Sequence, residues 1–191
     1  LHIDTARTWR GGQNQVLVTV LGLRALGHRT LLVAHPGGEL RQRAKEGLDL
    51  IPLAPKTEMD LGAAWRLSRL LKHLKPDIVH AHDWMVAHAA VELRRASGAP
   101  LAATIHATEA GRYRGWVTSE LSTTIHALEW WLANTADAVI TCSATMRGDS
   151  PRKGSSNMSS LGFAIRPRAI ATICCSPPDS ELASCARRSL R

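Results

Sequence analysis

The segment TARTWRGGQNQVLVTVLGLRALGH, residues 5–28, joins a short apolar run to a helical pattern through a pair of glycines, Gly11 and Gly12. A glycine in a helix costs about 0.5 to 1 kcal/mol relative to alanine, so a bare backbone at the start of this helix needs a reason. Helix N-termini carry unpaired N–H groups and the positive end of the helix dipole, which favour a bound anion. The segment therefore predicts a strand–turn–helix unit that approaches a diphosphate. A tight turn without a ligand is the alternative.

Short apolar runs alternate with helical patterns up to about residue 147, which is typical of a parallel sheet covered by helices on both faces. The expected strands lie at 1–4, 30–34, 49–53, 77–81, 101–105 and 138–142. The expected helices lie at 13–26, 38–46, 60–74, 84–97 and 119–135. We predict an α/β fold, a Rossmann-like parallel sheet of about six strands, as one domain over residues 1–147.

The last part of the chain, residues 148–191, has a different composition. It is rich in Ser, Arg, Pro and Cys and keeps no period of 2 or 3.6 residues, so we expect an irregular tail there. A shifted reading frame would explain the abrupt change, and a naturally disordered tail is the alternative. Because the chain opens inside an apolar run, we also expect it to be part of a longer protein.

Composition limits the class of protein. The chain of 191 residues is 45% hydrophobic and 21% charged, and no apolar run approaches the roughly 20 residues that span a bilayer. The net charge of +8 is spread along the chain, so we expect no nucleic-acid partner, although an anionic substrate or membrane surface would suit it. The four cysteines form no disulfide or metal-binding pattern. We expect a cytoplasmic protein, with contact to the inner face of the membrane as one option.

The stretch DIVHAHDW, residues 77–84, ends an expected strand with His80, His82 and Asp83. Histidine nitrogens and a carboxylate suit zinc or iron, so a metal site is one interpretation. No residue elsewhere in the sequence stands at a spacing that indicates a third or fourth metal ligand. In addition, the carboxyl ends of parallel strands commonly collect polar groups that bind ordinary ligands. We therefore expect His82 and Asp83 to bind substrate, and we expect no metal.

The stretch TIHATEAGRYRGW, residues 104–116, also follows a strand, so its polar side chains should face the same crevice as the glycine pair. A neutral histidine donates to a sugar hydroxyl, a glutamate accepts from one, and an arginine pairs with phosphate. A polar loop with a capping threonine is the alternative. The candidate ligand-binding residues here are His106, Thr108, Glu109, Arg112 and Arg114.

Four stretches together carry a family resemblance: WRGGQNQVL, KPDIVHAHD, ATIHATEAGRYRGW and EWWLANTADAVITCS. Residues 1–147 resemble the N-terminal domain of family 4 glycosyltransferases, retaining enzymes built from two Rossmann-like domains that face a cleft. The second half looks closest to bacterial glycogen-synthase-like members. The stretches TARTWRGGQNQVL and HPGGEL look more like members that build surface glycans.

This resemblance implies transfer of a sugar from a nucleotide-sugar donor to a glycan or other acceptor, with no cofactor beyond that co-substrate. Gly11 and Gly12 would approach the donor diphosphate, and His106 would contact the transferred sugar near its anomeric end as the catalytic residue. The family's second domain, which binds most of the donor, has no counterpart after Met146. We therefore expect this polypeptide alone to have little or no transferase activity.

Two other classes of function remain open. One is a non-catalytic Rossmann-like module that binds an anionic membrane or polymer through the basic residues of the third expected helix and its end, Arg66, Arg69, Lys72 and Lys75. The other is a small metallohydrolase that uses His80, His82 and Asp83.

Overall fold

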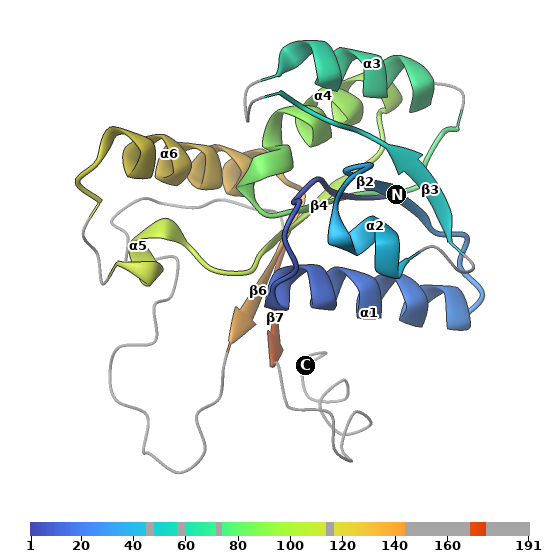
Figure 1. The fold of residues 1–191 in the computed structure, drawn as a ribbon, viewed down its shortest axis with the longest axis horizontal. Helices are drawn as coiled ribbons and strands as arrows, with labels where there is room; N and C mark the ends of the chain where they lie inside the picture. Colours follow the sequence, from blue (N-terminus) through green and yellow to red (C-terminus); the bar gives the residue numbers. More distant parts are fainter. Residues whose placement is uncertain (45–47, 57–59, 72–73, 114–116, 144–168, 175–191) are drawn as a thin grey trace.

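The sheet of this protein is parallel throughout and has the strand order β3-β2-β1-β4-β5-β6-β7 (Figure 1). It is seen in a computed structural model, which describes residues 1–44, 48–56, 60–71, 74–113, 117–143 and 169–174. The strands are β1 (His2–Asp4), β2 (Leu31–Ala34), β3 (Asp49–Pro52), β4 (Val79–His82), β5 (Leu101–Ile105), β6 (Ala138–Ser143) and β7 (Ala169–Cys174). The chain order reverses between β1 and β4, which are neighbours in the sheet.

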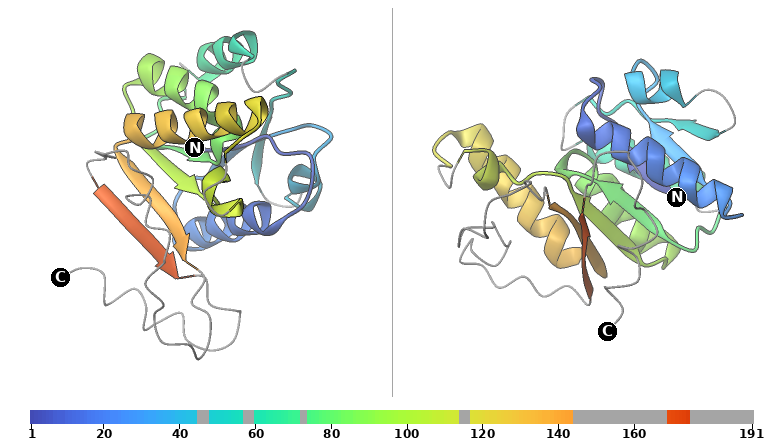
Figure 2. Two further views of the ribbon diagram at one scale, coloured as in Figure 1. Left: turned by 90° about the vertical axis from the view of Figure 1, so that its left-hand side faces the viewer. Right: turned by 90° about the horizontal axis from the view of Figure 1, so that it is seen from below.

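Helices cover both faces of the sheet (Figures 1 and 2). One face carries α3 (Leu61–Leu71), α4 (Ala87–Ser97) and α6 (Glu120–Thr135), and the other carries α1 (Gly11–Ala25) and α2 (Glu39–Arg43). Two short turns of helix follow strands, η1 (Trp84–Val86) after β4 and α5 (Glu109–Arg112) after β5. Within the described ranges, no helix combines the length and the apolarity needed to cross a membrane.

The alternation of side chains along β1 and β4 divides the interior into an apolar core and a polar layer. Ile3 and Ala81 point into the main core between the sheet and the helices α3, α4 and α6. Leu32 faces the opposite side, where it packs with Val16 and Val20 of α1. Successive residues of a strand point to opposite faces, so the polar neighbours of Ile3 and Ala81 lie on the α1 side. These residues are His2, Asp4, His80 and His82.

The α/β class, the parallel sheet and the two helical layers are confirmed. All six predicted strands are present, with ends within two residues of those expected. The helix at α1 begins at Gly11 rather than at residue 13, so the glycine pair forms its first turn. The short helix α5 occupies part of a segment expected as a loop.

The seventh strand was not predicted. Residues 169–174 lie in the segment expected to be irregular, yet they pair in parallel with β6 from Ala138↔Ala169 to Ser143↔Cys174. The exposed backbone edge of β6 accepts this run, whose β-branched residues Ile170, Thr172 and Ile173 suit a strand. The rest of the predicted tail lies outside the described residues.

Apolar residues recur at helical spacing along the helix expected at 60–74, which predicts one packed face, and the structure buries only part of that face. These residues are Leu61, Ala64, Leu67, Leu71 and Leu74. Ala64 and Leu67 are buried as expected, but Leu61 is 60% exposed and Leu74 is 38% exposed. Ala63 is buried instead, because the helix turns its small residues toward α4. The ends of α3 thus leave large apolar side chains at the surface.

Candidate functional site

The polar residues singled out in the sequence gather where β1, β4 and β5 end and α1 begins. Because β1 and β4 are the strands at which the chain order reverses, the loops after them run to opposite faces of the sheet, and we call the edge between these loops the crevice. The first turn of α1 follows β1, the Asp83 turn follows β4, and His106 follows β5. Open α/β sheets bind their ligands at this edge.

The ring of His106 lies against the first turn of α1. A Cβ atom added to Gly12 would lie 3.1 Å from His106 Cδ2, whereas one added to Gly11 would meet nothing within 4 Å. Gly12 is therefore bare because the imidazole occupies the space that a side chain would need. Gly11 leaves open space in front of the helix N-terminus.

A buried carboxylate holds this turn in place. Asp4 Oδ1 accepts the backbone N–H of Ala6 at 2.9 Å, and Asp4 Oδ2 accepts Gln13 Nε2 at 3.0 Å. Gln13 Oε1 in turn accepts the backbone N–H of Arg10 at 3.2 Å, which caps the helix start. Burial raises the pKa of Asp4, and the hydrogen bonds from Ala6 and Gln13 partly oppose that rise.

Four histidine rings form a row that runs from the carboxyl edge of the sheet, at His106 and His82, inward along β4 and β1 to His80 and His2. The centroids of His2 and His80 are 5.0 Å apart, those of His80 and His82 are 4.1 Å apart, and those of His82 and His106 are 5.8 Å apart. His2 Nδ1 lies 3.2 Å from His82 Nε2, and His80 Nε2 lies 2.7 Å from Thr104 Oγ1. The row thus extends from His106 at the edge of the sheet into the interior of the protein.

Burial keeps this row neutral near pH 7. Desolvation, with a smaller contribution from the neighbouring His80, lowers the pKa of His2 to about 3, and desolvation lowers that of His80 to about 4. The pKa of the fully enclosed His82 is also lowered, chiefly by burial. Burial lowers the pKa of His106 too, although the Asp4 carboxylate opposes this effect.

Asp83 has an unusual backbone conformation. Its φ of 67° and ψ of 172° lie in a region that side chains rarely adopt, at a cost on the order of 1 to 3 kcal/mol. The surroundings hold it there, because its N–H donates to Thr104 O at 2.9 Å and its carboxylate accepts the N–H of Trp84 at 3.2 Å. Burial raises the pKa of Asp83, and the guanidinium of Arg112, 3.7 Å away, opposes the rise.

Two glutamates join α5 to α6. Glu109 is buried, and its Oε1 accepts the hydroxyl of Ser122 at 2.7 Å while its Oε2 lies 3.4 Å from Arg112 Nη1. Both carboxylate oxygens of Glu129 lie 2.9 Å from the backbone N–H of Glu109. Burial raises the pKa of Glu129 to about 7, although that hydrogen bond favours the ionised form.

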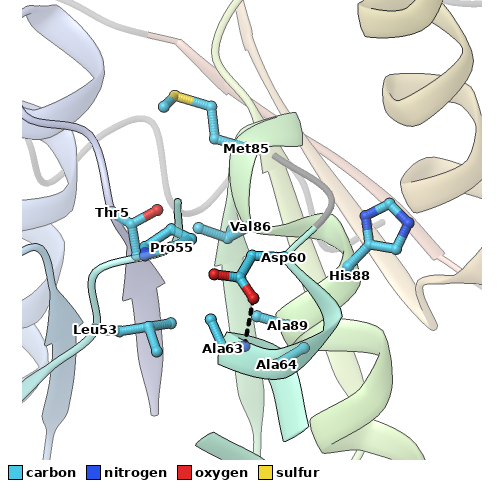
Figure 3. A pocket seen from close by; sticks show the side chains of 10 residues that line it. All are labelled: Thr5, Leu53, Pro55, Asp60, Ala63, Ala64, Met85, Val86, His88 and Ala89. Carbon is cyan, nitrogen blue, oxygen red and sulfur yellow. Dashed lines mark hydrogen bonds between the residues drawn. The ribbon is translucent and has the colours of Figure 1, made fainter. Parts of the chain in front are cut away.

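A small pocket opens beside the crevice on the α3 and α4 side (Figure 3). Its volume of about 10 Å³ is close to that of one water molecule. Thr5, His88 and Asp60 supply its polar groups, and Asp60 is already engaged with the N–H of Ala63 at 2.8 Å. The Thr5 hydroxyl is buried and has no hydrogen-bond partner among the described residues.

The structure brings most of the predicted site residues to one edge. Gly12 and His106 are in contact, Asp83 and Arg112 form an ion pair, and His82 stacks beside His106. Thr108 is the N-cap of α5, where its hydroxyl accepts the N–H of Gly111 at 3.0 Å, and Glu109 is turned into the protein. Arg114 lies outside the described residues.

Sequence reasoning missed four residues of this region. They are His2, Asp4, Gln13 and Glu129, which hold the first turn of α1, the histidine row and α5. A glutamine three residues after the start of a helix is a known capping signal and could have identified Gln13. The partners of His2 and Glu129 are set by contacts between distant segments, which spacing alone does not reveal.

The fold defines a Rossmann-like domain with a parallel sheet, a class of domain that commonly binds ligands at the carboxyl edge of the sheet. The chain belongs to glycosyltransferase family 4, because the model of Glycosyltransferase Family 4 matches residues 9–157.

Two curated relatives match shorter segments. The chain is 53% identical over 75 residues to a glycogen synthase of Mycobacterium tuberculosis, which is 39% of this chain and 18% of the relative. It is 36% identical over 73 residues to an uncharacterized glycosyltransferase of Methanocaldococcus jannaschii, which is 38% of this chain and 18% of the relative. The matches therefore span less than a fifth of these relatives.

Solved structures share the fold. A crystal structure of Anabaena HepE in complex with UDP and glucose matches with a TM-score of 0.56 and 14% identity, over 73% of this chain and 36% of that one. A crystal structure of Acinetobacter baumannii MurG matches with a TM-score of 0.54 and 15% identity, over 74% of this chain and 40% of that one. The fold of this chain is thus that of a part of each of these proteins.

The two glycines should respond differently to alanine. In Gly12→Ala the new methyl group would crowd the His106 ring, so we expect the imidazole NMR signals of His106 to shift and stability to gain little. In Gly11→Ala, the matched control, nothing opposes the methyl group, and we expect unchanged His106 signals with a gain of a few tenths to about 1 kcal/mol. Equal His106 shifts in both variants would contradict this packing.

The buried carboxyl of Glu129 should make stability fall as pH rises. Its pKa of about 7 in the folded chain exceeds the ordinary value of 4.5, so the folded state binds more protons between these values. At about 1.36 kcal/mol per pKa unit, the wild type should lose up to about 3 kcal/mol relative to Glu129→Gln between pH 4.5 and pH 8. Urea unfolding across this range measures the difference.

The control is Glu92→Gln, whose free energy of unfolding should change with pH as that of the wild type does. If the free energies of unfolding of the wild type and Glu129→Gln change equally with pH, the assignment is wrong.

Proposed function

We propose that this chain is the acceptor-side domain of a retaining glycosyltransferase that moves a sugar from a nucleotide-sugar donor to a glycan or other acceptor. The observation that carries the proposal is the contact between His106 and Gly12 at the start of α1. It places a neutral imidazole beside unpaired backbone N–H groups, so a ligand with a sugar and a diphosphate would meet complementary groups side by side.

His106 is the residue we assign to the reacting centre. A neutral imidazole both donates and accepts hydrogen bonds, which suits a sugar hydroxyl near the anomeric carbon. The pKa of His106 is lowered by burial, so the ring is in this neutral form at neutral pH. Its packing against Gly12 fixes where the ring lies, and such fixed positioning is what group transfer requires.

The start of α1 is the part we assign to the donor phosphates. Departure of a nucleoside diphosphate builds up negative charge, which oriented N–H groups and cations stabilise. Gly11 has open space in front of it, so a phosphate has room to approach the backbone. The UDP and glucose held by HepE support a donor of this class.

We assign the other predicted residues of this edge to substrate binding. Arg112 lies between Asp83 and Glu109, 3.7 Å from the first carboxylate and 3.4 Å from the second, and presents a cation at this edge. Asp83, with its constrained backbone, and His82 line the same edge, and Thr108 fixes the start of α5. We also propose that this transfer takes place in the cytoplasm.

Activity measurements test this assignment. The purified 191-residue chain should show no measurable turnover of nucleotide sugars, because its match spans only 18% of the glycogen synthase that it resembles. A fusion to the second domain of a family 4 enzyme should gain turnover, and His106→Ala in that fusion should lower kcat/KM at least about 100-fold. The exposed His28→Ala serves as the control. Robust turnover by the chain alone, or full activity of the His106→Ala fusion, would overturn the proposal.

A second candidate function is binding to an anionic membrane surface through α3. The Arg69 guanidinium lies 4.9 Å from the ring centre of Trp65, and Trp65 and Leu61 are 58% and 60% exposed. Exposed apolar side chains with arginines beside them are typical of helices that lie in a membrane interface. Arg66 and Lys75 are exposed as well, whereas Lys72 lies outside the described residues.

Vesicle binding tests the second candidate. Arg66→Gln with Arg69→Gln should weaken binding to phosphatidylserine-containing vesicles about 10- to 30-fold, because each basic residue at such a surface contributes about 1 kcal/mol. Added salt should weaken the binding of the unchanged chain. The control is Arg24→Gln with Arg29→Gln, two exposed residues away from α3 that remove the same charge. Binding that is insensitive to salt, or equally weakened by the control, would rule out this surface.

A further inference from the structure

We propose that His2, His80 and His82 form a binding site for one divalent transition-metal ion of the Zn²⁺ class. These side chains come from two neighbouring strands, β1 and β4, and point to the same face of the sheet. One ring nitrogen of each lies within 4.8 Å of those of the other two. The proposal does not rest on the sugar-transfer function proposed above, although the two sites share His82.

The spacing of two of the nitrogens already suits a shared ion. Zn–N bonds are about 2.0 to 2.1 Å long, so two nitrogens at tetrahedral positions on one zinc lie about 3.3 to 3.4 Å apart. His2 Nδ1 and His82 Nε2 are 3.2 Å apart. The third ring needs only a small adjustment, because the 4.8 Å limit exceeds the tetrahedral spacing by about 1.5 Å.

The hydrogen bonds within the cluster do not fully account for it. Only one hydrogen occupies the contact between His2 and His82, and His82 Nδ1 is buried with no hydrogen-bond partner among the described residues. A buried polar atom without a partner is costly. Metal binding at His2 Nδ1 and His82 Nε2 moves that hydrogen to the distal nitrogen of the same ring, so the cluster releases no net proton.

A partner outside the three ligands orients His80. Histidines that bind metal usually use their other ring nitrogen in a hydrogen bond that fixes the ring. His80 Nε2 and Thr104 Oγ1 are 2.7 Å apart, which leaves His80 Nδ1 for the ion. Thr104 comes from β5, so three adjacent strands build the site. The sequence argument against a metal was the lack of a third ligand, and His2 supplies it in place of Asp83.

The surroundings favour the chemistry of imidazole ligation. The three side chains are buried, at 4%, 9% and 3% exposed. Neutral imidazole suits zinc, copper, nickel and iron, whereas magnesium and calcium prefer oxygen ligands. The proposal commits to a borderline ion, for which Zn²⁺ and Co²⁺ are the probes.

Metal titration of the 191-residue chain tests the site. After removal of bound metal, Zn²⁺ should bind with one ion per chain by calorimetry and should raise the thermal midpoint. Co²⁺ should give the intense visible absorption of four-coordinate cobalt with imidazole ligands. Binding that does not saturate near one equivalent, or a Co²⁺ spectrum of the six-coordinate aqueous type, would overturn the proposal.

Variants separate this site from other histidines. His82→Gln should weaken Zn²⁺ binding at least about 100-fold, whereas His28→Gln and His88→Gln, which lie outside the cluster, should bind as the wild type does. Thr104→Val removes the partner of His80 without removing a ligand, and it should weaken binding about 10-fold. Thr104→Val tests the site even if His82→Gln fails to fold. An unchanged Zn²⁺ affinity in Thr104→Val would count against the site. Losses of Zn²⁺ affinity in His28→Gln and His88→Gln as large as that in His82→Gln would also count against it.

Discussion

The approach of the His106 ring to the first turn of α1 is the contact on which the crevice depends. It joins the end of β5 to the helix that follows β1, across the intervening strand β4. A side chain at position 12 would require the ring to move, because its Cβ would lie 3.1 Å from His106 Cδ2. The Asp4–Gln13 hydrogen bond fixes the same turn from the sheet side, so the helix start is held between a carboxylate and an imidazole. The position of one glycine thereby sets the geometry of a site built from three strands.

The edge of the sheet combines acidic groups that are buried with a cation that is half exposed. Asp4, Glu109 and Glu129 are each at most 5% exposed, whereas Arg112 reaches the surface between Asp83 and Glu109. Burial raises the pKa of Asp4 and of Glu129, which limits the negative charge beneath the crevice. The start of α1 adds the partial positive charge of a helix N-terminus. An anionic ligand at this edge would therefore meet less repulsion than the count of carboxyl groups suggests.

The fold could be predicted because the signals that define its strands and helices lie within short stretches of the sequence. The apolar runs, the helix periods and the breakers at Gly27, Pro76 and Gly98 mark the elements, and Gly27 and Gly98 have the positive φ values that such ends need. The crevice followed from the same local information, since strands of one direction end at one edge. His82, Asp83 and His106 could be placed there without knowing their neighbours.

The partners of those residues were not predictable, because pairing between strands decides them. His2 meets His80 only through the register of β1 against β4, which joins residues 78 positions apart. No local signal in the sequence marks Glu129, whose carboxylate accepts the backbone N–H of Glu109, a residue 20 positions away. The strand β7 had a local signal in its β-branched residues, but the composition around it resembled no domain. The expected burial of Leu61 and Leu74 was wrong for a different reason. Helical spacing predicts which face of a helix packs, but it does not predict how far the neighbouring helix extends along that face.

The strand β3 has a further consequence for the behaviour of this chain in solution. It lies at one end of the strand order, so within the part of the chain that the structure describes no strand pairs with one row of its N–H and C=O groups. Such an edge is a template for self-association through added strands. β3 spans only Asp49–Pro52, begins with an exposed charged residue and ends with one that lacks an N–H group. Its shortness, charge and proline are the features by which natural sheets discourage a second molecule from extending them.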